Sequence, residues 1–517
     1  MAISTSRSSQ NLVETPGLNQ VVLPSLSLDE TIEQIIGGFG WSQFMQAILV
    51  SIPAFFDAQQ TFISIYADAE PKWHCSTFDT TCNSSSNICQ LPKSAWSWDE
   101  PSHNTIISEW GLECASSFIT GLPASSFFIG SLIGGFTLAT LGDFCLGRKN
   151  LLHLSCLIMS VTALMTAFST NIWMYSSLRF VSGLGRASII TCSLILLAER
   201  VGKRWRGQLG MTAFFSYSLG LLSLPGIAYL NRGSSWRHLY LCTSIPAISY
   251  NIIAYFFVYE SPRWLLMQGR NKEAIAILRR IASIEGRSLE SYLSSIQPTQ
   301  EISKVNPYKS MKDLFKRRWA LQQIFAAMVI GFGIGVVYFG MLLGVGNLDF
   351  SIYLSVIFNA SLLIPSNLLA LFFIARWKRK VSLFAFCITS GICSIICLVV
   401  GSGREGIQIG LELASFFCSS LAYNVLIIFT IELFPTSVRN SATSLARQAV
   451  AFGSVFDPIL TSAGRRNEFL SFGIFGLTIL LCGFFVIILP ETRGKTLCNT
   501  MDEQERKDSM IVWAYFI

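Results

Sequence analysis

The chain has 517 residues with a mean hydropathy of +0.50, and only 13% of its residues are charged. A soluble protein of this length needs far more polar surface, so the composition excludes a soluble enzyme or a soluble binding domain. The net charge of +7 is spread over short basic segments between apolar runs, which is typical of membrane-protein loops. No nucleic acid is therefore expected as a partner.

Apolar runs of about 20 residues recur along the chain, and each is predicted to be a membrane-spanning helix, because a backbone in lipid must satisfy its own hydrogen bonds. The predicted spans are residues 39–66, 119–142, 151–169, 173–198, 208–230, 236–258, 320–345, 349–374, 381–401, 406–431, 442–463 and 469–489. Six of them precede and six follow a long polar segment. The sequence therefore predicts an all-α membrane protein with twelve transmembrane helices in two six-helix halves, embedded in a lipid bilayer.

Basic residues gather on one side of this topology, at Arg148, Lys149 and the segments 200–206, 259–319 and 376–380. The positive-inside rule then places both termini in the cytoplasm. The predicted division is a cytoplasmic segment at 1–38, a first half at 39–258 with an external loop at 67–118, a cytoplasmic loop at 259–319, a second half at 320–489 and a cytoplasmic tail at 490–517. This topology suits a plasma membrane or a vacuolar membrane equally.

The external loop carries four cysteines, Cys75, Cys82, Cys89 and Cys114. An even number of cysteines in an oxidising compartment predicts two disulfides, and the spacing leaves their pairing open. The alternative is four unpaired thiols. The triplet that begins at Asn83 is an acceptor pattern for N-glycosylation, so Asn83 is expected to be glycosylated.

Ionisable side chains inside membrane spans are expensive and are therefore candidates for function. Asp57 lies mid-way through the first span and is followed by Gln60. Its carboxylate is expected to pair with a substrate ammonium or to carry a proton, and the alternative is a structural salt bridge to a basic residue such as Arg447. Arg447 and Asp457 lie in the eleventh span, about 80° apart around the helix and roughly 15 Å along it. Both are expected to border a central cavity, where Arg447 would receive the carboxylate of a zwitterion; alternatively, Arg447 reaches to the membrane surface.

No catalytic set is expected, because none of the four histidines is spaced with a serine, cysteine or carboxylate as in a triad or a metal site. The sequence therefore predicts neither enzymatic activity nor a cofactor or metal.

Several motifs lie at the ends of the predicted spans. They are ATLGDFCLGRK at 139–149, YESPRWL at 259–265, ELFPTSVRN at 432–440, LPETRG at 489–494 and SEWGLEC at 108–114. With FFDAQQTF at 55–62 and VVYFGMLLGVGNL at 336–348, they make the chain resemble the organic cation/carnitine transporter family of the major facilitator superfamily, in particular its plant members. The resemblance covers residues 40–495. It implies the major facilitator fold and carrier-mediated movement of carnitine and related cations by alternating access, in some members coupled to a proton or sodium.

The resemblance also implies which residues gate the carrier. In the loop after the second span, Asp143, Gly147, Arg148 and Lys149 would clamp neighbouring helix ends through charge-assisted hydrogen bonds that break when the halves rock. Glu260 and Arg263 after the sixth span, and Glu432 and Arg439 after the tenth, are further gating candidates. The equivalent segment of the second half, 377–380, keeps the basic residues but lacks the acid and the glycine, which predicts asymmetric gating.

Cation recognition also calls for aromatic faces. The resemblance places Tyr338 and Phe339 of the seventh span along the substrate path, and Tyr217 of the fifth span is expected to add to such a cage. The alternative for each is an ordinary core or lipid-facing position. In animal relatives a charged residue at the position of Ala451 helps to sort cations from anions, and here that charge is missing.

Two other functions remain open from the sequence. A sugar/proton symporter is favoured by the motifs at 259–265 and 489–494, although the seventh span lacks the glutamine-rich stretch of that family. A receptor that binds a ligand without moving it belongs to a different class. Substrate uptake into vesicles distinguishes all three.

Overall fold

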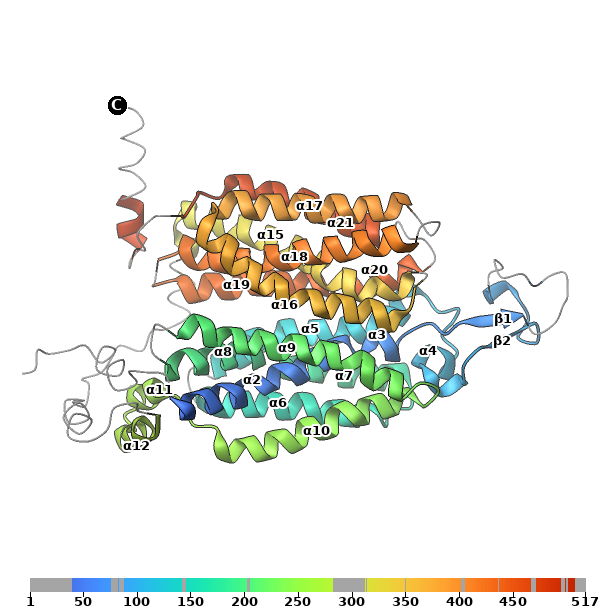
Figure 1. Ribbon diagram of the computed structural model, residues 1–517, viewed down its shortest axis with the longest axis horizontal. Helices are drawn as coiled ribbons and strands as arrows, with labels where there is room; N and C mark the ends of the chain where they lie inside the picture. The colour runs from blue at the N-terminus through green and yellow to red at the C-terminus, as the bar shows by residue number, and fades with distance from the viewer. Residues whose placement is uncertain are drawn as a thin grey trace, which may run out of the picture.

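The computed structural model describes residues 40–75, 82, 88–141, 146–201, 205–281, 312, 314–348, 350–400, 405–435, 437–465, 471–493, 498 and 501–506. Helices form two stacked layers in Figure 1, with the first half of the chain below and the second half above. Asn83 and Asp143 lie outside the described residues.

The first layer contains the helices from the first half of the chain. They are α2 (Trp41–Phe62), α3 (Ser64–Ala67), α5 (Ser117–Leu141), α6 (Gly147–Thr166), α7 (Ile172–Arg186), α8 (Ile189–Arg200), α9 (Arg206–Leu230) and α10 (Trp236–Phe257). The fourth predicted span is thus divided into α7 and α8. Prolines inside α2, α5, α9 and α10 are accommodated within the bundle.

The second layer is built from the second half of the chain. Its elements are α15 (Arg318–Leu343), η4 (Gly344–Asn347), α16 (Ile352–Arg376), α17 (Arg379–Val400), α18 (Glu405–Leu433), α19 (Arg439–Ser454), α20 (Asp457–Gly464), α21 (Phe472–Gly483) and η7 (Phe484–Ile488). The eleventh predicted span is interrupted at Val455 and Phe456, and the twelfth ends as a 3₁₀ helix. The layers meet where α9 packs against α16 and where α5 packs against α19 and α20.

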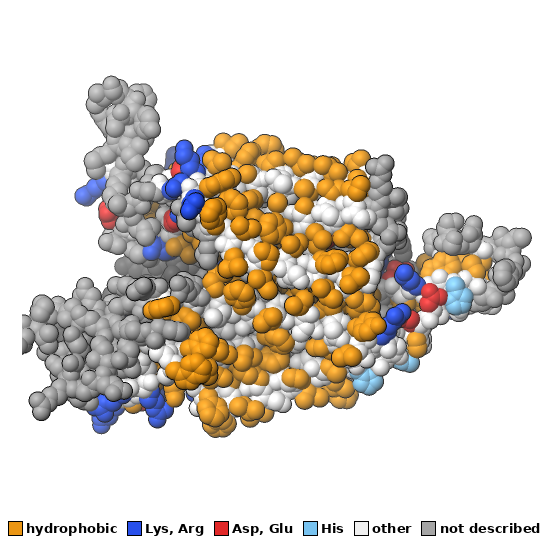
Figure 2. Space-filling model, in the orientation of Figure 1, with side chains coloured by type: hydrophobic (Ala, Val, Ile, Leu, Met, Phe, Trp, Pro, Cys, Tyr) orange, Lys and Arg blue, Asp and Glu red, His pale blue; other side chains and the backbone are white. Residues whose placement is uncertain are grey.

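Ten helical segments of the described chain are long and apolar enough to cross a membrane, and the twelfth predicted span appears as a shorter apolar helix. Large apolar side chains such as Phe256, Leu230 and Val399 are at least three-quarters exposed on the outside of the bundle. Figure 2 shows apolar side chains over the middle of the bundle, with lysine and arginine side chains at its two ends. This surface suits lipid contact along the whole bundle.

The two ends of the bundle differ. At one end, called the disulfide end, β1 (Trp73–Cys75) pairs antiparallel with β2 (Trp96–Trp98), beside η1 (Ile88–Gln90), η2 (Ser102–Asn104) and α4 (Ile106–Glu109). The structure pairs Cys75 with Cys82 and Cys89 with Cys114. Trp236 Nε1 donates to Glu109 Oε2 at 2.6 Å, and Arg237 also pairs with Glu109, so this excursion is attached to α10.

The opposite end, called the basic end, contains the starts of α6 and α17 and the short helices α11 (Pro262–Met267) and α12 (Asn271–Ile281). The apolar face of α12 packs against α11 and against the start of α2. Gln43 Nε2 donates to the Ile281 carbonyl at 3.1 Å, which fixes α12 to the first layer.

Glycines allow the helices of each layer to approach closely. A side chain on Gly335 of α15 would collide with the carbonyl oxygen of Val450 in α19. The glycine run at 331–335 therefore serves helix packing, as is typical of small residues at helix contacts in membranes.

Candidate functional site

A central cavity of about 530 Å³ lies between the two layers. Helices α2, α5, α6, α7, α8 and α9 line it from the first layer, and α15, α16, α18 and α19 line it from the second. Its charged lining consists of one carboxylate and four guanidinium groups: Asp57, Arg148, Arg186, Arg439 and Arg447. A cavity between the halves, with few polar groups among apolar walls, is typical of a small-molecule site.

Asp57 of α2 forms an ion pair with Arg186, the last residue of α7. Arg186 Nε lies 2.8 Å from Asp57 Oδ1, and Arg186 Nη2 donates to Asp57 Oδ2 at 3.3 Å. The carboxylate is 1% exposed. Asp57 therefore pairs with a basic residue, as the structural alternative expected, but this residue is Arg186 and not Arg447, the example named for it. Arg186 was missed, although the rule that singled out Asp57 as an ionisable residue inside a span applies to it equally.

Arg447 lies on the opposite wall of the cavity, on α19, and pairs with no carboxylate among the described residues. Ala451, one turn further along α19, also lines the cavity. A guanidinium group without a carboxylate in such a cavity can bind an anionic group of a substrate by a bidentate hydrogen bond.

Aromatic rings form much of the remaining wall. Tyr338 of α15 stacks on Phe416 and Tyr423 of α18, with ring centroids 5.4 and 5.9 Å apart. Phe339 packs 5.2 Å from Phe128 of α5, and Tyr217 of α9 lies on the same cavity. The structure thus brings Tyr217, Tyr338 and Phe339 together with Asp57 and Arg447.

Two of the residues predicted to touch substrate lie elsewhere. Gln60 Nε2 donates to Thr243 Oγ1 at 3.0 Å, and the Gln60 carbonyl accepts from Arg179 Nη1 at 2.9 Å, so Gln60 is buried inside the first layer. Asp457 is completely buried at the start of α20 and does not line the central cavity. Both of its carboxylate oxygens lack a hydrogen-bond partner among the described residues.

The gating candidate Glu260 caps the N-terminus of α6. It accepts hydrogen bonds from the backbone N–H groups of Arg148 and Lys149, each at 3.0 Å. Gly147 has a φ of +80°, and a side chain there would collide with Glu260, so the turn requires glycine. A carboxylate at this position satisfies unpaired N–H groups and interacts favourably with the helix dipole.

The second layer contains the same cap. Glu491 accepts from the backbone N–H groups of Arg379 at 3.0 Å and Lys380 at 3.2 Å, at the start of α17. The first and second caps each join residues 111 and 112 positions apart. Glu491 is thus the counterpart of Glu260, and this cap is the same in both layers. The expected asymmetric gating concerned the acid and the glycine that 377–380 lacks, and it stays a prediction because Asp143 lies outside the described residues.

The other gating candidates lie around these caps. Glu432 pairs with Arg379 at 2.9 Å and accepts from Thr492 Oγ1 at 2.7 Å. Arg439 Nε donates to the Phe434 carbonyl at 3.3 Å and borders the central cavity. Arg263 follows Glu260 at the start of α11. Each of these ion pairs and caps lies within one layer.

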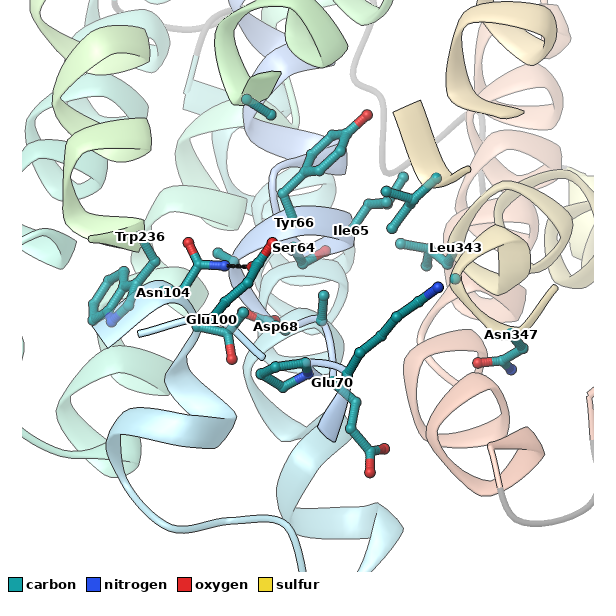
Figure 3. Close-up of a pocket in the computed structure, with 18 of the residues that line it drawn as sticks. Ser64, Ile65, Tyr66, Asp68, Glu70, Glu100, Asn104, Trp236, Leu343 and Asn347 are labelled. Atoms are coloured by element: carbon teal, nitrogen blue, oxygen red, sulfur yellow. Dashed lines mark hydrogen bonds between the residues drawn. The ribbon is translucent and has the colours of Figure 1, made fainter. Parts of the chain in front are cut away.

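At the disulfide end the two layers are joined. A vestibule of about 1170 Å³ lies there, with Tyr66 and Glu70 on one side and Leu343 and Asn347 on the other (Figure 3). Arg465, after α20, donates to the Asp68 carbonyl at 2.9 Å and lies 3.9 Å from Glu70. The central cavity instead extends toward the basic end, where Arg148 and Arg439 line it.

Asp68 lies at the first turn beyond the first span. Burial raises the pKa of its carboxyl group to about 6, although nearby Arg179 and Arg465 and a hydrogen bond from Tyr175 oppose the rise. Tyr175 Oη donates to Asp68 Oδ1 at 2.7 Å. This carboxyl group therefore titrates close to neutral pH, at the contact that joins the layers.

Comparison with known proteins places the chain among transporters. The sequence pattern of the family described as "Sugar (and other) transporter" matches residues 37–503. Organic cation/carnitine transporter 2 of Arabidopsis thaliana is 54% identical, over 93% of this chain and 94% of the relative. Organic cation/carnitine transporter 3 of the same plant is 53% identical, over 94% of each chain. The inward-open xylose transporter of E. coli shares the fold with a TM-score of 0.62 at 17% identity, covering 88% of this chain and 98% of that one.

Proposed function

Because the chain belongs to the organic cation/carnitine transporters of the "Sugar (and other) transporter" family, we propose that it carries small quaternary ammonium compounds, carnitine among them, by alternating access. The family resemblance and the major facilitator fold expected from the sequence are confirmed by these matches and by the shared fold of the xylose transporter. Sugar transport has support only from that distant fold neighbour, so the cation function is favoured over it.

The observation that supports this substrate class is the composition of the central cavity. Aromatic rings of Tyr217, Tyr338 and Phe339 offer faces for a quaternary ammonium, and the carboxylate of Asp57 lies beside them. Four arginines against one aspartate give the lining a formal charge of +3, which disfavours a simple cation. A zwitterion offsets this charge, because its carboxylate can bind Arg447 while its ammonium lies against the rings.

Counterflow in proteoliposomes tests this assignment. Proteoliposomes containing the purified protein are loaded with unlabelled carnitine, and the entry of labelled carnitine is measured. The same exchange is then measured for choline, which has the quaternary ammonium group but no carboxylate. Losing one charge-assisted hydrogen bond of about 1.5–3 kcal/mol should slow carnitine exchange by roughly 10- to 100-fold in Arg447→Gln and leave choline exchange within about twofold.

Equal losses for both compounds would show that Arg447 supports the helix packing rather than the carboxylate. Unchanged carnitine exchange would remove Arg447 from the site. Entry of labelled xylose or glucose but not of labelled carnitine would favour the sugar symporter, and saturable binding without counterflow would favour a receptor.

Orientation follows from charge. The basic end carries the starts of α6 and α17 and the helices α11 and α12, and the positive-inside rule places such an end in the cytoplasm. The structure would then be open to the cytoplasm and closed at the disulfide end. An antibody should label an epitope tag at the C-terminus only after the cells are permeabilised. Labelling of intact cells would show that the protein has the opposite orientation. Imaging of the tagged protein distinguishes the plasma membrane from the vacuolar membrane.

A further inference from the structure

Asp457 is a buried carboxyl group in a membrane protein, and its oxygens have no hydrogen-bond partner among the described residues. It begins α20, it has no exposed surface, and neither oxygen accepts a hydrogen bond from a described residue. An ionised carboxylate in such surroundings is very unfavourable, and a group of this kind normally becomes neutral instead. The geometry is therefore that of a carboxylic acid that holds its proton.

No charge on the neighbouring elements compensates Asp457. Helix α20 packs against α5, α15, η4 and α19, and α5 and η4 contain no titratable residue. The charged or titratable residues of the other two elements are Arg318, Tyr338, Arg439 and Arg447. Arg318 and Arg439 begin their helices at the basic end, and Tyr338 and Arg447 line the central cavity. Arg447 lies ten residues earlier on α19, before the interruption that separates α19 from α20.

The position of Asp457 along its helix links the two cavities. Ser454, three residues earlier, lines the central cavity. Pro458, the next residue, and Thr461, four residues later, line the vestibule at the disulfide end. Asp457 and Thr461, four residues apart, share one face of α20, and Ser454 is the last residue of α19 just before the interruption. Along the chain, Asp457 therefore lies between a residue that lines the central cavity and residues that line the vestibule. Thr461 Oγ1 is also buried and has no hydrogen-bond partner in the described part of the chain.

The same place is a contact between the two layers. A side chain on Gly121 of α5 would lie 2.8 Å from the Ile459 Cα atom, so the two backbones touch. Ser125 Oγ of α5 donates to the Val455 carbonyl at 2.8 Å, at the interruption between α19 and α20. When the layers separate at the disulfide end during alternating access, α5 must move away from α20. The carboxyl group of Asp457 would then be exposed to water.

We propose that Asp457 binds the proton that is transported together with the substrate, receiving it from the vestibule past Thr461 and releasing it to the central cavity past Ser454. The inference rests on the transport function proposed above and adds its coupling ion. A proton needs one oxygen atom, whereas a hard metal cation takes about six oxygen ligands. Asp457 and Thr461 together offer three unpartnered side-chain oxygens, which favours the proton over sodium.

The test uses full-length protein in proteoliposomes containing a pH-sensitive dye. In the wild type, an inward proton gradient should raise initial uptake of labelled carnitine by about fivefold or more, and adding carnitine outside should acidify the lumen. Asp457→Asn imitates the protonated acid and cannot release a proton. We expect this variant to lose both effects of the gradient while its carnitine counterflow at equal pH stays within about twofold of the wild type.

Glu412→Gln is the matched control. Glu412 of α18 is equally buried, but it accepts from Asn359 Nδ2 at 3.2 Å and lines neither cavity. This variant should keep gradient-driven uptake and acidification. Asp57→Asn should lose uptake and counterflow together, because it removes the carboxylate that pairs with the ammonium group of the substrate.

The outcomes are distinguishable. Absence of counterflow in the wild type would refute the transport function and this inference together. Wild-type counterflow with no response to the proton gradient, or with a response to sodium alone, would refute only the proton site. Full coupling in Asp457→Asn would also refute it, whereas loss of coupling in Glu412→Gln as well would show that buried carboxyl groups in general are responsible.

Discussion

The ion pair between Asp57 and Arg186 can be tested for separate structural and functional roles. Arg186 is 11% exposed and Asp57 is 1% exposed, so removing the carboxylate leaves a buried guanidinium without its partner. Breaking a buried pair in this way typically costs about 3–5 kcal/mol. Asp57→Asn should therefore lower the melting temperature in detergent by roughly 3–6 °C, and it should abolish carnitine uptake.

The double variant Asp57→Asn/Arg186→Gln distinguishes the two roles. Two neutral amides can pair across the same gap, so most of the lost stability should return, with a coupling of roughly 2–3 kcal/mol in a double-mutant cycle. Uptake should remain absent, because the substrate ammonium still lacks a carboxylate. Recovery of uptake along with stability would show that Asp57 serves only to neutralise Arg186. A fall of less than about 1 °C in the single variant would contradict the burial argument itself.

Three further changes have expected outcomes. Glu260→Gln and Glu491→Gln should each lower the free energy of unfolding by about 1–2 kcal/mol, because each removes the charge from an equivalent helix cap; thermal unfolding that shows clearly unequal losses would deny the equivalence. Gly335→Ala should reduce the monodisperse yield in size-exclusion chromatography through overpacking of about 1–3 kcal/mol, while Gly226→Ala, which meets nothing within 4 Å, should not. Burial raises the pKa of Asp68 to about 6, so the folded protein holds this proton more tightly than the unfolded chain. Stability should then fall by up to roughly 3 kcal/mol as the pH rises from about 4 to about 6, and melting curves of Asp68→Asn should lack this fall.

The helical spans were largely predictable because a long apolar segment in lipid must form its backbone hydrogen bonds within itself, as a helix does. The division of the eleventh span was not predictable from hydropathy. Its first part, α19, carries Arg439, Arg447 and Gln448 and faces the cavity, whereas α20 is buried against α5. The predicted angle of about 80° between Arg447 and Asp457 assumed one straight helix. Because the helix is interrupted between them, this prediction did not show that only Arg447 borders the central cavity.

Contacts between residues that are far apart in the sequence could not be predicted either. Asp57 and Arg186 are 129 residues apart, and only the folding of α2 and α7 into the same layer brings their side chains together. Sequence patterning identified both Glu491 and the basic segment 377–380, but not that the first would cap the second across the layer. Conversely, Tyr217, Tyr338 and Phe339 were placed on the path by chemistry and resemblance alone, and all three line the cavity.

The disulfides have a mechanical consequence. Both cross-links of the described chain close short rings, of 7 and 25 residues in separation, within the stretch that precedes α5. Neither ring links one six-helix unit to the other, so these two disulfides set no limit on how far the units rotate. The disulfide-bonded segment should move with the first six-helix unit, because Glu109 attaches it to Trp236 of α10. A reductant should therefore loosen this segment without slowing the turnover of the carrier.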